Sequence, residues 1–148
     1  MTISNDSELK ATLQGLSTAQ QRQVAARFTE SVLALSSDPR VAGAVIAAKR
    51  PDITEQELAA MYQAAKTASV ESYTQCGKEC DWAVQAGHFV SKAATACVQP
   101  AEPDNSPAWE AAMQARMARM SETIATGAGT ENREAEEQYR ILEAFLNQ

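Results

Sequence analysis

The sequence predicts an all-α fold, an antiparallel bundle of six or seven helices in a single domain that spans residues 1–148. Helix-starting patterns recur along the chain, and apolar residues return at intervals of three and four, with no segment that reads as a strand. Apolar residues make up 45% of the chain but aromatic residues only 5%, and alanine is the most frequent apolar residue. Alanine favours helices and lets them pack closely. A chain of this length can bury a core without metal ions or disulfide bonds.

The first third of the chain contains three predicted helices. Ser7–Leu16 is a short candidate helix, and a capping box that begins at Ser17 starts the next one. Asp38 and Pro39 start a third helix as its N-cap and first helical residue. This helix ends before Pro51, because the residue that precedes a proline is pushed out of helical geometry. The inward face of the second helix is predicted to hold Val24, Phe28, Val32 and Leu35.

The stretch Thr54–Cys97 organises the rest of the chain, because it is an almost unbroken run of helix-forming sequence that holds all three cysteines and the only histidine. A capping box at Thr54 starts one helix, which we expect Gly77 to end as a C-terminal cap. A second helix, Lys78–Val98, then folds back on the first. A single helix of about 40 residues is the alternative, but it far exceeds the usual length. The predicted inward side chains are Leu58, Met61, Tyr62, Ala65, Ser69, Ser72, Tyr73 and Cys76 on the first helix and Trp82, Ala86, Phe89, Ala93, Ala96 and Cys97 on the second.

Three prolines mark residues 99–107 as a proline-rich loop. Ser106 is the predicted N-cap of the next helix, which ends at Gly127 and Gly129, and Thr130 caps the last helix. The predicted inward residues of these two helices are Trp109, Met113, Met117, Met120 and Ile124, followed by Ala135, Tyr139, Leu142, Phe145 and Leu146. We interpret the methionines as core side chains rather than as a soft-metal site or an adaptable interface.

The net charge of −6 is unevenly distributed along the chain. Residues 1–98 carry ten acidic and nine basic side chains, whereas residues 99–148 carry nine and four. The chain lacks a basic stripe that could neutralise phosphates, so we expect no nucleic-acid partner. A basic protein partner suits this charge better, although a solvated acidic face is the alternative. The candidate partner-binding residues are Glu131, Glu134, Glu136 and Glu137.

Other features limit the location of the protein. No run of about 18 apolar residues occurs, so we expect no membrane-spanning helix. The polar stretch Met1–Glu8 lacks the apolar region of a secretory signal. Three cysteines are an odd number, and we expect them to be reduced thiols in a cytoplasmic protein.

Cys76, Cys80 and His88 are the candidate metal ligands or redox thiols of the chain. A structural zinc site needs four ligands in a tetrahedron, and these three converge only if a turn at Gly77 brings them together. In that case Cys76 and Cys80 would be close enough to form a disulfide. Cys97 lies about 180° from His88 around a straight helix, so it cannot join them. The alternative is that the cysteines are buried and act as small apolar side chains.

Several short features between residues 24 and 98 follow one another in a recognisable order. They are Phe28-Thr29-Glu30-Ser31-Val32-Leu33, Asp38-Pro39-Arg40, the helix Ala42–Ala48, the helix start Ile53-Thr54, and Ala86-Gly87-His88 in an alanine-rich helix. This order, over about half of the chain, resembles a group of alanine-rich, all-helical bacterial proteins to which an immunity function is ascribed. The resemblance implies a bacterial, cytoplasmic protein that binds and neutralises a toxin, and it implies no catalytic residue.

These observations predict a non-enzymatic protein-binding module, such as an immunity or antitoxin-like inhibitor of a basic partner. The chain has neither a GxSxG elbow nor a P-loop, and we expect no catalytic residue and no cofactor. The alternative is a thiol-redox or metal-binding helical protein that uses Cys76, Cys80 and His88.

Overall fold

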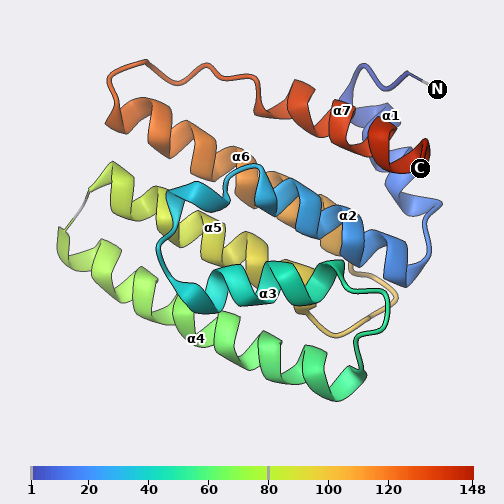
Figure 1. Cartoon of the computed structure of the whole chain (residues 1–148). Helices are drawn as coiled ribbons and strands as arrows, with labels where there is room; N and C mark the ends of the chain where they lie inside the picture. Colours follow the sequence, from blue (N-terminus) through green and yellow to red (C-terminus); the bar gives the residue numbers. More distant parts are fainter. Residues whose placement is uncertain (1, 80) are drawn as a thin grey trace.

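The computed structural model describes residues 2–79 and 81–148, and this part of the chain is helical with no strand (Figure 1). The α-helices are α1 (Asp6–Gln14), α2 (Thr18–Glu30), α3 (Pro39–Lys49), α4 (Glu55–Glu79), α5 (Trp82–Val98), α6 (Pro107–Ala125) and α7 (Glu134–Leu146), with a 3-10 helix, η1 (Leu33–Leu35), between α2 and α3. The predicted all-α bundle is therefore confirmed. None of the described helices is both long and apolar enough to cross a bilayer.

Helix α5 lies in the middle of the bundle. It packs between α4 and α6 and also contacts α2 and α3 (Figure 1). Helices α1 and α7 lie beside α6 and α2 on the outer side, where both ends of the chain are found. The backbone N–H of Ile3 donates to a carboxylate oxygen of Glu143 at 2.6 Å, which ties the N-terminal segment to α7.

The predicted starts of three helices are confirmed. Ser17 forms a capping box at the start of α2. Asp38 caps α3 by accepting from the backbone N–H of Arg40 at 2.9 Å, and Thr54 accepts from the backbone N–H of Glu57 at 3.1 Å at the start of α4. These patterns are reliable because each satisfies an N–H group that has no partner within the first helical turn.

Gly77 does not end its helix, contrary to the prediction. Helix α4 continues through it to Glu79, and α5 starts after its N-cap, Asp81. A glycine ends a helix by adopting a positive φ, and Gly77 does not adopt one. The two helices still fold back on each other, but the turn between them comes later than predicted.

Thr130 is not the cap of the last helix, which is a second correction. Helix α7 begins at Glu134, whose backbone N–H donates to the side-chain oxygen of Asn132 at 3.0 Å. Gly127 and Gly129 have φ angles of 79° and 86°, in the left-handed region that favours glycine. The chain therefore turns away from the axis of α6 at these glycines, and residues 126–133 connect the two helices.

Alanine forms the contact between α5 and α6. The buried alanines are Ala86, Ala93, Ala94 and Ala96 on α5 and Ala108, Ala111, Ala112, Ala115 and Ala118 on α6. Sequence periodicity had favoured larger inward side chains, and four of them lie at the surface instead: Tyr73, Trp82, Met117 and Leu146. A methyl side chain lets two helix backbones approach more closely than tryptophan or methionine does, so the large side chains of α6 lie at the edges of the contact.

Cys97 is buried, as predicted. Its sulfur lies 3.2 Å from the hydroxyl of Thr29 on α2 and donates to the carbonyl of Ala93 at 3.3 Å. Burial raises the pKa of this thiol to about 12. Because the thiolate is the reactive form, Cys97 is an inert core side chain near neutral pH. Phe89 packs against the same core, whereas Trp82, the other predicted neighbour, is exposed.

Arg119 of α6 attaches the start of α7 to α2. Its guanidinium donates to Glu134 at 3.0 Å, to Glu122 at 2.8 Å and to the carbonyl of Ser31 at 2.9 Å. The hydroxyl of Ser31 donates to the other oxygen of Glu134 at 2.7 Å. Glu134 is only 4% exposed, so its charge is held inside the protein by these partners.

Arg116, one turn earlier on α6, attaches α1 and the middle of α7. It donates to both oxygens of Asp6, at 2.9 and 2.7 Å, and to the side-chain oxygen of Gln138 at 2.9 Å. Gln138 is fully buried and donates in turn to the carbonyl of Ala112, while Tyr139 donates to Asp6 at 2.8 Å. Helices α1 and α7 thus dock through polar side chains that have specific partners.

We predict that Ala115→Leu destabilises the protein by about 1–3 kcal/mol, because the closely packed contact between α5 and α6 has no space for a larger side chain. Ala125→Leu, at an exposed position in the last turn of the same helix, is the matched control and should change stability by less than about 0.5 kcal/mol. Urea unfolding followed by circular dichroism measures both. Equal effects of the two substitutions would contradict the packing argument.

We predict that Asp6→Asn destabilises the protein at pH 7 and has little effect near pH 2. The hydrogen bond from Arg116, with a smaller contribution from Tyr139, holds the pKa of the Asp6 carboxyl below its ordinary value of 3.8, against burial, which raises it. A carboxyl whose pKa is lower in the folded state stabilises the protein above its unfolded-state pKa, and this contribution is lost as the pH falls through the folded-state pKa. Urea midpoints of both proteins from pH 7 to pH 2 test this, and a pH-independent difference would argue against it.

Candidate functional site

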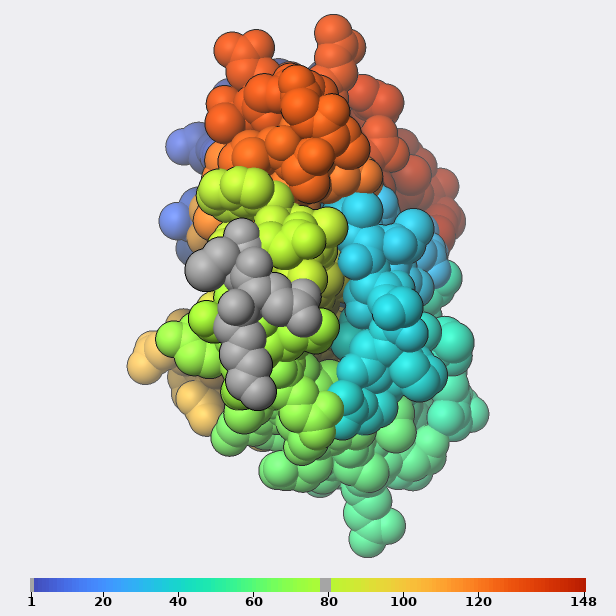
Figure 2. Space-filling view, turned by 90° about the vertical axis from the view of Figure 1, so that its left-hand side faces the viewer, coloured from blue at the N-terminus to red at the C-terminus, as the bar shows by residue number. Residues whose placement is uncertain are grey.

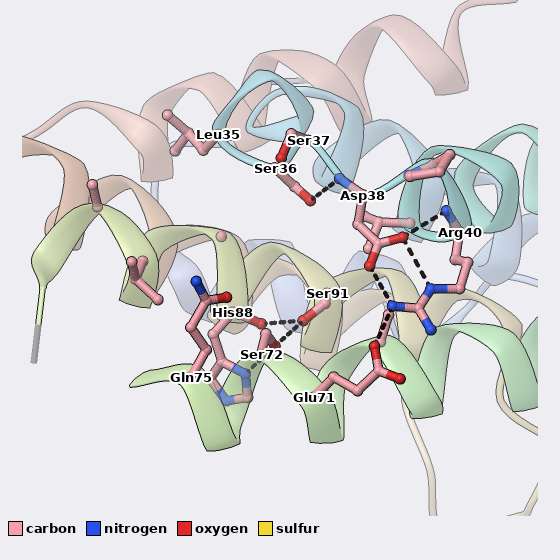
Figure 3. A pocket seen from close by; sticks show the side chains of 16 residues that line it. Leu35, Ser36, Ser37, Asp38, Arg40, Glu71, Ser72, Gln75, His88 and Ser91 are labelled. Atoms are coloured by element: carbon pink, nitrogen blue, oxygen red, sulfur yellow. Dashed lines mark hydrogen bonds and ion pairs between the residues drawn. The ribbon is translucent and has the colours of Figure 1, made fainter. Parts of the chain in front are cut away.

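A cleft of about 700 Å³ lies between the segment 35–41, the second half of α4 and the first half of α5. Figure 2 looks onto this end of the molecule, where the segment around residues 32–42 lies beside the ends of α4 and α5. A volume of this size is typical of ligand-binding sites. The lining is rich in polar side chains, which form two clusters on either side of the cleft (Figure 3).

Local sequence features position the walls of the cleft. A side chain at Gly87 would place its Cβ 3.3 Å from the carbonyl oxygen of Leu35, so the glycine lets α5 approach η1 closely. Directly after η1, the cap formed by Asp38 turns the chain into α3 and leaves Ser36 and Ser37 at the mouth of the cleft. Two short motifs, Gly87 on one side and Ser-Ser-Asp-Pro on the other, therefore shape the opening.

The first polar cluster joins α4 to α5 through His88. Its Nδ1 lies 2.8 Å from the hydroxyl of Ser72, and that hydroxyl lies 3.1 Å from the hydroxyl of Ser91 (Figure 3). Ser91 donates its proton to the carbonyl of His88 at 2.6 Å, and Ser72 donates to the carbonyl of Ser69 at 2.9 Å. The contact between Nδ1 and Ser72 needs one proton, which either the ring or the hydroxyl can supply.

The charge of His88 follows from its surroundings. Burial lowers the pKa of His88 from its ordinary value of 6.5, and nearby Lys92 lowers it further, while the carbonyl of Ser69 raises it. The ring is therefore neutral at pH 7.

The second cluster is an ion-pair triad across the mouth of the cleft. Arg40 donates to both oxygens of Asp38, at 3.1 and 2.7 Å, and to Glu71 of α4 at 2.6 Å (Figure 3). These hydrogen bonds from Arg40 lower the pKa of both carboxyl groups, so both are ionised at neutral pH. Two carboxylates share one guanidinium, and with His88 neutral the cleft carries a net negative charge.

Exposed large side chains lie next to the cleft. Tyr73 is 70% exposed, and its ring packs against that of His88 at a tilt of 52°, with 5.7 Å between the ring centres. Val70 is also exposed, one turn before Tyr73 on the same helix, and Trp82 is 45% exposed next to Ala83, which lines the cleft. Tyrosine and tryptophan are enriched in protein interfaces, where they provide much of the binding energy.

Of the three predicted metal or thiol residues, the structure describes His88 and Cys76. His88 lines the cleft, and Cys76 is partly exposed on α4. Cys80 lies outside the described residues, so the pairing of Cys76 with Cys80 stays a prediction. Among the His, Cys, Asp and Glu side chains of the described chain, no group of three or more is arranged to hold a metal ion.

The four predicted partner-binding glutamates, at the start of α7 and just before it, differ in their surroundings. Glu131 and Glu136 are exposed, and Glu137 pairs with Arg140 at 3.1 Å. Glu134 points inward to Arg119, so its carboxylate is not offered to a partner. A surface of this kind stays a prediction for the three outer glutamates.

Sequence reasoning missed most of the cleft. Ser72 was assigned to an inward helix face, Asp38 was interpreted only as a cap, and Arg40 and Glu71 were given no role. Arg40 and Glu71 are 31 residues apart, and no local pattern indicates that they meet. Only the unique His88 gave a signal that pointed to this region.

No family model matches the sequence, and neither a curated protein nor a solved structure matches it. The function proposed below therefore depends on the chemistry of the cleft.

We predict that His88 titrates below pH 6.5, because its burial and nearby Lys92 disfavour the charged ring. The folded protein then binds this proton less readily than the unfolded chain, so His88 lowers stability as the pH falls from about 7 through the folded-state pKa. NMR observation of the single imidazole gives the midpoint directly. Lys92→Gln should raise the midpoint, whereas Lys66→Gln, on α4, should leave it unchanged. A wild-type midpoint at or above 6.5 would contradict the prediction.

Proposed function

We propose that the chain is a non-enzymatic protein-binding module that receives a cationic side chain of a basic partner in the cleft of Asp38, Glu71 and His88. The observation that carries the proposal is the triad, in which two carboxylates share one arginine at the mouth of a cleft of about 700 Å³. An arginine or lysine of a partner supplies the missing positive charge, and an arginine can form two parallel hydrogen bonds with a carboxylate.

The surroundings of the triad support a protein as the partner rather than a small molecule. Glu71 is the more exposed of the two carboxylates, with 60% of its side chain accessible, so an incoming cation can approach it. Exposed Tyr73, Val70 and Trp82 provide apolar contacts beside the charged centre. Aromatic anchors next to a charged group are typical of protein interfaces.

The overall charge supports the same choice. A net charge of −6 attracts basic proteins over distances of about a Debye length and raises their rate of association. An inhibitor of a toxin, as implied by the resemblance to immunity proteins, is one function of this kind. The bacterial origin and cytoplasmic location belong to this same proposal.

The proposal predicts that an arginine-containing peptide binds at the cleft. The probe is a capped peptide of alternating glycine and arginine, compared with its glycine–glutamate counterpart. In two-dimensional NMR, the arginine peptide should shift amide signals of residues 36–41, 71–75 and 84–88, and the shifts should weaken with added salt. The glutamate peptide should shift none of these signals.

Glu71→Gln should weaken binding of the arginine peptide several-fold, because the cleft then has one carboxylate for one arginine. Glu55→Gln, in the first turn of the same helix and outside any ion pair of the described residues, is the matched control. Equal affinity of the Glu71→Gln variant would overturn the cleft proposal. If only the amide signals of Glu131, Glu136 and Glu137 shifted, the binding surface would instead lie around the start of α7.

A further inference from the structure

A second cavity lies on another side of α5, between α4, α5 and α6. It has a volume of about 390 Å³, and Trp109 and Met113 of α6 provide its large apolar side chains. Four long polar side chains also line this cavity: Lys92, Gln99, Glu110 and Gln114.

Two of these side chains are unsatisfied. The side-chain nitrogen of Gln99 and the side-chain oxygen of Gln114 are buried from solvent and have no hydrogen-bond partner among the described residues. Buried polar groups almost always have partners, so two orphaned amide atoms at one cavity require an explanation. A glutamine amide both donates and accepts, so a ligand that carries an acceptor and a donor would satisfy the two groups together.

The two charged side chains of the cavity, Lys92 and Glu110, carry opposite charges. Lys92 and Glu110 form no ion pair with the described residues, and they line the cavity from opposite helices. Lys92 of α5 and Gln99, the C-cap of that helix, are seven residues apart, and Glu110 and Gln114 are four residues apart on α6. The α5 side of the cavity therefore offers a cation and an amide, and α6 offers a carboxylate and an amide.

We propose that this cavity binds a free amino acid with a large apolar side chain. Its carboxylate binds Lys92 and Gln99, its ammonium group binds Glu110 and Gln114, and its side chain packs on Trp109 and Met113. A cavity of this volume has room for such a molecule. The glutamine amides reach the ligand by a change of side-chain rotamer. This site is separate from the proposed partner-binding cleft and requires neither its residues nor its partner.

The experiment uses four related probes: L-phenylalanine, N-acetyl-L-phenylalanine, L-phenylalanine amide, and N-acetyl-L-phenylalanine amide. Binding is measured by NMR shifts of residues 92–99 and 109–114 in the full chain. We expect L-phenylalanine to bind most tightly, each singly blocked compound to bind at least ten-fold more weakly, and the doubly blocked compound to give no shifts. Equal binding of all four compounds, or no binding of L-phenylalanine, would overturn the proposal.

A substitution separates a binding role from a purely structural one. Gln114→Met removes the orphaned oxygen with little change in volume, so the free protein should become more stable while its affinity for L-phenylalanine falls. Gln63→Met, on the exposed face of α4, is the control and should change neither property. If Gln114→Met lowers stability, or leaves the affinity unchanged, Gln114 does not serve an amino acid ligand. Far-UV circular dichroism confirms that each variant is folded.

Discussion

The close approach of α5 to its neighbours is the constraint on which the rest of the structure depends. One helix of 17 residues contacts α2, α3, α4 and α6, and this is possible only because its buried side chains are small. Alanine contributes little buried area per residue, so the stability of such a core comes from the number and closeness of its contacts. The largest buried apolar side chains, Leu9, Leu13, Phe28 and Leu142, come instead from α1, α2 and α7.

Both candidate sites follow from this geometry. The part of α4 that follows Ala68, the last fully buried alanine of that helix, has mostly exposed or partly exposed side chains. The cleft opens where this part of α4 and the start of α5 lie beside the segment 35–41. On the other side of α5, the cavity of Trp109 and Met113 forms where large side chains of α6 lie beside the alanine contact rather than within it. Displacing large side chains from a close helix contact thus creates concave surfaces at its edges.

Sequence patterns predicted the local features of the fold and few of its long-range contacts. The caps at Ser17, Asp38 and Thr54 were predictable because they act within four residues. The buried face of α6 was not predictable in this way. Its large apolar residues recur at helical spacing and were assigned to the core, whereas close packing of the helices buries the alanines. The cleft depends on contacts between residues that are far apart in the sequence, and no local pattern predicts such contacts. Arg40 meets Glu71 and Ser72 meets His88 only after α3, α4 and α5 have packed together.

The distribution of charge along the sequence also differs from its distribution in space. The C-terminal third has the larger excess of acidic residues, yet Glu122 and Glu134 share Arg119, and Glu137 pairs with Arg140. Arg116, from the same third, neutralises Asp6 near the other end of the chain. A carboxylate that is already paired and partly buried stabilises the fold and has little attraction left for a partner. The cleft differs in exposure, because Glu71 shares Arg40 with Asp38 and still has 60% of its side chain accessible, whereas only 3% of the Glu134 side chain is accessible. The balance of each carboxylate with its own neighbours, rather than the net charge of a segment, therefore indicates where a cation can bind.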